Sequence, residues 1–68
     1  MVKKRFERWD AYDWIDTDKP GMKKEVCLLG RREAAKLSKE IARDQGVLLS
    51  IKELIEVFRR YGWKKCKR

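Results

Sequence analysis

The chain has 68 residues and a formal net charge of +8, and 44% of its residues are charged. A chain this short forms one small domain with a limited core, so we interpret residues 1–68 as a single basic domain. Because it has no histidine and two cysteines, it lacks Ser–His and Cys–His nucleophilic pairs and cannot complete a standard zinc site.

The polar composition is skewed toward Lys, Arg and Glu, a bias described for thermophile proteins. The positive balance favours a polyanionic partner, either DNA or RNA, or else an acidic protein surface. No apolar run approaches the length of a membrane span, and residues 1–10 show no signal-peptide pattern. We therefore expect an intracellular, cytoplasmic protein without a membrane partner.

Residues 11–29, which follow a basic N-terminal arm (residues 1–8), predict a β-hairpin. The first strand covers residues 11–15, because Tyr12 and Trp14 alternate with polar neighbours. Pro20 marks the turn, and residues 23–29, with a charged start and an apolar end, form the second strand. The two segments fit an antiparallel pair joined by a longer loop.

Residues 31–44 predict the first helix. At about 100° per residue, small and apolar side chains share one arc, and charged side chains share the opposite one. The first arc consists of Ala34, Ala35, Leu37, Ser38, Ile41 and Ala42. Gly46 closes this helix in a left-handed conformation. The alanine-rich arc allows another element to approach closely.

Residues 51–61 predict the second helix. Ser50 and Glu53 have the spacing of a capping box, and Gly62 is the expected stop, with Trp63 folding back on Phe58. Between the helices, residues 47–49 are either a short third strand beside the second hairpin strand or an apolar linker. The predicted class is a small α+β fold, in which the hairpin packs on two helices.

Cations gather on the first helix and at both chain ends. Lys36, Lys39 and Arg43 advance about one turn at a time, a spacing that can follow a phosphate backbone. The predicted nucleic-acid-binding residues are Lys3, Lys4, Arg5, Arg8, Arg31, Arg32, Lys36, Lys39, Arg43, Lys64, Lys65, Lys67 and Arg68. The last four lie in a basic C-terminal tail, residues 64–68.

Three tryptophans, Trp9, Trp14 and Trp63, are candidates for stacking on unpaired bases or for anchoring a protein partner. A domain this small also needs such rings in its core. A recognition helix at residues 51–61 is disfavoured, because Glu53 and Glu56 lie on its outward face and would oppose phosphates. The second helix is therefore interpreted mainly as scaffold.

The remaining motifs do not predict a metal, a cofactor or an enzyme. The aspartates of residues 10–18 lack the ligand spacing of a calcium loop, because Pro20 and Cys27 occupy ligand positions. Cys27 and Cys66 are expected to be free thiols inside the cell, with a disulfide between them as the alternative. We therefore expect a small non-enzymatic protein that binds nucleic acid mainly through phosphates. The alternative is an interaction module, an inhibitor or adaptor, that docks on an acidic partner.

Overall fold

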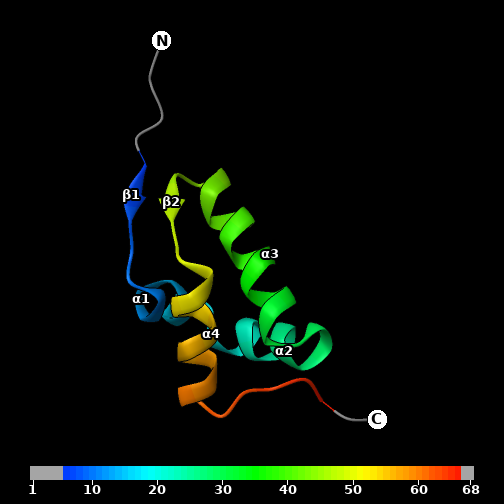
Figure 1. Cartoon of the computed structure of the whole chain (residues 1–68). Helices are drawn as coiled ribbons and strands as arrows, with labels where there is room; N and C mark the ends of the chain where they lie inside the picture. The colour runs from blue at the N-terminus through cyan, green and yellow to red at the C-terminus, as the bar shows by residue number, and fades with distance from the viewer. Residues whose placement is uncertain (1–5, 67–68) are drawn as a thin grey trace.

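The computed structural model describes residues 6–66 and consists, within them, of two short strands and four helices (Figure 1). In chain order these are β1 (Glu7–Arg8), α1 (Ala11–Asp16), α2 (Lys19–Leu29), α3 (Arg31–Asp44), β2 (Val47–Leu48) and α4 (Ile51–Arg60). The predicted small α+β class is confirmed, although helices predominate.

The predicted β-hairpin is wrong, because α1 and α2 occupy its place. The carboxylate of Asp10 accepts a hydrogen bond from the Tyr12 backbone N–H at 2.9 Å and caps α1. Ala11, Trp14 and Ile15 then fall on one buried face at helical spacing. The alternation of Tyr12 and Trp14 is too short to distinguish a strand from a single helical turn.

The predicted turn around Pro20 is instead the first turn of α2. Asp18 precedes the helix, and its carboxylate accepts from the Gly21 N–H at 3.3 Å. Proline is tolerated in a first turn, because its missing N–H would have no partner within the helix there. Val26 faces the core. Proline and glycine therefore begin a helix here, where the sequence pattern indicated a break between strands.

The two predicted helices are confirmed. α3 spans the predicted residues 31–44, and α4 ends at Arg60, just before the predicted end at residue 61. The Ser50 hydroxyl accepts from the Glu53 N–H at 3.4 Å, as expected for the N-cap. After α4, the Trp63 N–H donates to the Phe58 carbonyl at 2.9 Å, and the two rings stack with centroids 6.1 Å apart.

The strand interpretation of residues 47–49 is confirmed at β2, but its partner is β1. The two strands are parallel, with Glu7 opposite Val47 and Arg8 opposite Leu48. The N–H of Trp9 also donates to the carbonyl of Leu48 at 3.2 Å. The segment before α1 is thereby attached to the link between α3 and α4.

The core lies where all four helices meet. α3 packs against both α2 and α4, and α4 also packs against α1. In Figure 1, α3 and α4 stand in front of α1 and α2. The largest fully buried side chains are Phe58, Ile15, Leu54 and Val26, so each of α1, α2 and α4 contributes at least one of them. The alanines of α3 allow the close approach that the sequence predicted.

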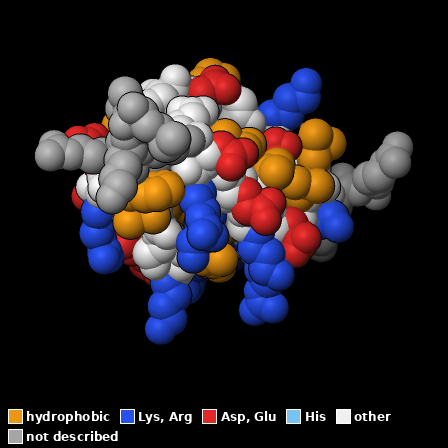
Figure 2. Space-filling view, turned by 90° about the horizontal axis from the view of Figure 1, so that it is seen from above, with side chains coloured by type: hydrophobic (Ala, Val, Ile, Leu, Met, Phe, Trp, Pro, Cys, Tyr) orange, Lys and Arg blue, Asp and Glu red, His pale blue; other side chains and the backbone are white. Residues whose placement is uncertain are grey.

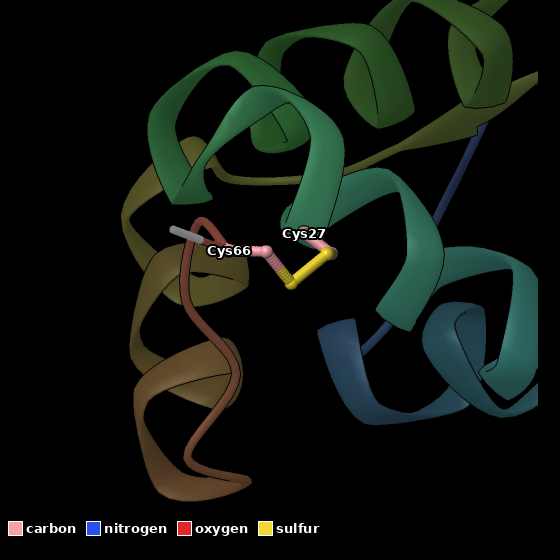
Figure 3. The surroundings of a disulfide bond; sticks show 2 residues. All are labelled: Cys27 and Cys66. Atoms are coloured by element: carbon pink, nitrogen blue, oxygen red, sulfur yellow. A yellow bond between two sulfur atoms is a disulfide. The ribbon is translucent and has the colours of Figure 1, made fainter. Parts of the chain in front are cut away.

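A disulfide joins Cys27 on α2 to Cys66 in the tail, so the expectation of free thiols is wrong (Figure 3). The Cys66 N–H also donates to the Cys27 carbonyl at 2.9 Å. Further along, the Arg31 Nε donates to the Trp63 carbonyl at 2.8 Å. Residues 63–66 are therefore fixed across the end of α2 and the start of α3, although they have no regular secondary structure.

Gly30, between α2 and α3, has φ of 90° and ψ of 164°, a region that is essentially restricted to glycine. A Cβ at this position would have its nearest neighbours, atoms of Lys65, at 3.7 Å, so there is space for a methyl group. We expect Gly30→Ala to lower the free energy of unfolding by about 1–3 kcal/mol through backbone strain alone. Urea denaturation followed by circular dichroism measures this loss.

The comparison variant is Gly62→Ala. Gly62 has a φ of 76°, and a Cβ there would meet nothing within 4 Å, so strain is again the sole expected cost. Because alanine adopts this left-handed conformation at a cost of about 1–2 kcal/mol, Gly62→Ala should lose that much stability. Stability equal to wild type in Gly30→Ala would contradict the assignment of strain to residue 30.

Candidate nucleic-acid interface

The outer surface of α3 separates its charges into two stripes. At about 100° per residue, cations and carboxylates occupy adjacent arcs of the exposed face. The basic stripe consists of Arg32, Lys36, Lys39 and Arg43, and the acidic stripe of Glu33, Glu40 and Asp44. Because the signs are not interspersed along the helix, one side of α3 presents mainly positive charge.

The basic stripe faces the start of α4. A shallow groove of about 320 Å³ is lined by Lys36, Lys39, Glu40 and Arg43 of α3 and by Ile51 of α4. We call this site the basic groove. Three of its four lining residues from α3 are cations and the fourth is Glu40, while half-buried Ile51 supplies an apolar contact on the α4 side.

α4 adds cations to the same side of the molecule. Lys52 and Arg59 are exposed and flank Ile55 at the spacings of adjacent helical turns. Ile51 and Ile55 form the half-buried flank of α4 on this side. Lys52 and Arg59 were not among the residues predicted for the site, because Glu53 and Glu56 made the exposed face of this helix unfavourable for phosphates.

The charges of the groove remain largely available to a ligand. Lys36 lies 3.7 Å from Glu33, but both side chains are more than half exposed, and such surface pairs contribute little. Within residues 6–66, Lys39 and Arg43 form no ion pair. An incoming phosphate would therefore not need to displace a strong internal partner.

The other predicted arginines occupy three different places. Arg32 lies on the basic stripe and is exposed. Arg31 is half-buried, and its Nε donates to the Trp63 carbonyl. Arg8 lies 3.6 Å from Glu53, a residue on the far flank of α4 from the groove.

Five of the predicted cations lie outside the described residues. These are Lys3, Lys4, Arg5, Lys67 and Arg68. The two tail lysines within the description, Lys64 and Lys65, are exposed and lie at a second depression that also includes Lys23 of α2. Lys23 was absent from the predicted set, because the sequence placed it on a strand, without a connection to the tail.

The three tryptophans also differ in position. Trp14 is 8% exposed and lies in the core, against half-buried Trp9 in an edge-to-face pair with centroids 6.1 Å apart. Burial leaves little of the Trp14 ring available for stacking, and its Nε1 has no hydrogen-bond partner in the described structure. Trp63 is half-buried beside the tail lysines.

The opposite flank of α4 carries mixed charge. The pKa of Arg60 is raised, first by the Tyr12 side chain and then by Glu56, which lies 3.5 Å from its Nε. Asp10 and Glu53 line the same surface. These carboxylates make this flank a poorer surface for phosphates than the basic groove.

Figure 2 looks down on the β1 and β2 end of the molecule. Most Lys and Arg side chains in this view project along its lower edge, which corresponds to the side of Figure 1 facing the viewer. Acidic and hydrophobic side chains are mixed over the centre.

Comparison with protein-family models, with curated proteins and with solved structures found no match to this chain. Among residues 6–66, no group of three or more His, Cys, Asp or Glu side chains is arranged to bind a metal ion. None of the helices in that range is long and apolar enough to cross a membrane.

Proposed function

We propose that this protein binds nucleic acid without catalysis, mainly by contacting phosphates through the basic groove. The observation that carries the proposal is the separation of charge on α3, which places Arg32, Lys36, Lys39 and Arg43 on one side of the helix. Cations advancing along one helix face can follow successive phosphates, and contacts of this type do not depend on base sequence.

As part of this proposal, we place the protein in the cytoplasm. A disulfide is unusual there in mesophiles but occurs in intracellular proteins of hyperthermophiles. The Lys- and Glu-rich composition is of the kind found in such organisms. The Cys27–Cys66 bond is therefore compatible with an intracellular nucleic-acid partner.

The first test is the matched pair Lys39→Glu and Lys24→Glu. Both residues are exposed helical lysines, so the change in net charge is the same, but Lys39 alone of the two lines the basic groove. We expect Lys39→Glu to weaken binding to labelled DNA about tenfold at low salt, and to reduce the slope of log affinity against log salt by about 1. Lys24→Glu should have a small effect on both.

Fluorescence anisotropy with several oligonucleotide sequences, from about 50 to 200 mM salt, measures both quantities. The loss in Lys39→Glu should be similar for every sequence, because phosphates carry no sequence information. Absence of binding at low salt, binding that is independent of salt, or equal losses in the two variants would contradict the proposal. Circular dichroism checks that both variants are folded.

A second candidate function is docking on an acidic protein surface as an inhibitor or adaptor. It is supported by Leu28, which is 62% exposed at the end of α2, beside Leu29 at 39%. Exposed leucines next to cations are suited to a protein partner with apolar and acidic groups. A pull-down after nuclease treatment separates the two functions, since partners that persist favour this second one.

A further inference from the structure

The tail forms a pocket of about 480 Å³ against α2. It is lined by Lys23, Cys27, Gly62, Trp63, Lys64, Lys65 and Cys66. We call it the tail pocket. Its volume is within the range of about 300–1,000 Å³ that is typical of sites for small ligands.

The walls of the tail pocket are fixed by long-range contacts. The disulfide and the bond from the Cys66 N–H to the Cys27 carbonyl attach one end of the tail to α2 (Figure 3). Arg31 binds the Trp63 carbonyl from the start of α3. The backbone of Lys64 and Lys65 is thus held between two anchors, and their charges are kept near Lys23.

The charge of the tail pocket selects an anion. Three of its lining residues are lysines, and no carboxylate is among the lining residues. Within the described chain, none of these lysines forms an ion pair. Three unpaired ammonium groups around one depression attract a phosphate more strongly than a single exposed lysine does.

The other wall of the tail pocket is apolar and aromatic. The Trp63 ring stacks on Tyr61, with ring centroids 4.7 Å apart, and on Phe58, with ring centroids 6.1 Å apart. The disulfide adds a further apolar surface beside it. A flat aromatic wall next to cations is the arrangement that binds a base and its phosphate together, because every base has a π face.

We propose that the tail pocket binds one unit of single-stranded nucleic acid, with its base against Trp63 and its phosphate among Lys23, Lys64 and Lys65. This inference rests on the proposed nucleic-acid function and specifies the class of ligand. Bases in a duplex are stacked within the helix and cannot reach a protein aromatic without being unpaired. A single strand presents them freely, so the pocket gives a preference for single strands over duplex.

The test compares Lys23→Glu with Lys24→Glu, two exposed neighbours on α2, of which Lys23 alone lines the tail pocket. The probes are a fluorescent oligothymidine of about 12 nucleotides, within the site sizes of single-strand binders, and a duplex of the same length. We expect Lys23→Glu to weaken binding of the single strand about tenfold, and Lys24→Glu to weaken it about twofold or less. The duplex should be affected equally by the two variants.

A third variant, Trp63→Leu, tests the aromatic wall, and Trp63→Phe is its conservative control. Leucine should lower single-strand affinity by about tenfold, while phenylalanine should retain most of it. Unfolding curves show whether each variant is folded at the temperature of the assay.

Two results would overturn the tail-pocket inference alone. One is an equal loss in Lys23→Glu and Lys24→Glu for the single strand, and the other is a preference of the wild type for duplex. In both cases, Lys39→Glu would still weaken binding if the proposed function is right. Failure of the wild type to bind either probe at low salt would instead reject both the function and this inference.

Discussion

Reduction of the Cys27–Cys66 disulfide is expected to lower the free energy of unfolding by about 4 kcal/mol. The bond closes a long loop, with a sequence separation of 39, and so removes much of the conformational freedom of the unfolded chain. In a domain of this size, such a loss corresponds to a fall in Tm of roughly 15–30 °C. Thermal unfolding with and without a thiol reductant measures it.

The control is the double variant Cys27→Ala with Cys66→Ala. Its stability should match that of the reduced wild type and should not respond to the reductant. The expected loss is comparable to the total stability of roughly 3–10 kcal/mol that is usual for a chain this short. The disulfide is therefore expected to decide whether the fold persists at high temperature. A difference below about 1 kcal/mol between oxidised and reduced protein would contradict this entropic account.

The elements that could be predicted from sequence are those with long periodic patterns. α3 and α4 each repeat their apolar positions over several turns and carry recognisable ends, such as Ser50 before α4 and Gly62 after it. The apolar arc of α3 also predicted which residues lie on the opposite, exposed arc. The basic residues Lys36, Lys39 and Arg43 could be placed on one face for that reason.

The first half of the chain could not be predicted in the same way, because its signals are short and ambiguous. α1 has six residues, too few to distinguish a period of two from one of 3.6. Asp10 and Asp18 are unfavourable inside a helix but favourable as N-caps, and the choice depends on where the helix begins. The packing of Trp14 and Ile15 into the core settles that choice in the folded protein.

Contacts between distant segments were also inaccessible to local patterns. Nothing in the sequence around Glu7 specifies pairing with Val47. Whether Cys27 and Cys66 are free thiols or form a disulfide also could not be decided without the fold. The tail pocket depends on both a helical α2 and the disulfide, which together place Lys23 beside Lys64. A signal that could have identified Lys23 was its helical spacing from Cys27, four residues along the chain.

Phe58→Ala is expected to destabilise the protein by about 3–5 kcal/mol. Phe58 is fully buried on α4 and is among the largest such side chains in the described structure. Its loss leaves a cavity in the core, and the packed helices around it can fill this space only in part. Denaturant unfolding, compared with wild type in the oxidised state, measures the loss. A cost below about 1 kcal/mol would show that Phe58 is not central to the core.

The conservative variant Phe58→Leu tests whether the core supports the aromatic wall of the tail pocket. Leucine keeps most of the apolar volume, so the cost should stay below about 1.5 kcal/mol and the protein should remain folded. It removes the ring that stacks under Trp63 at 6.1 Å, however, and so loosens one support of the aromatic wall. We expect Phe58→Leu to weaken single-strand binding several-fold, because a base gains less from a mobile indole.

Duplex binding through Lys39 should be unchanged, since the basic groove lies at the opposite end of α3 and α4 from Trp63. Equal effects on single strand and duplex would mean that Phe58 acts only through global stability.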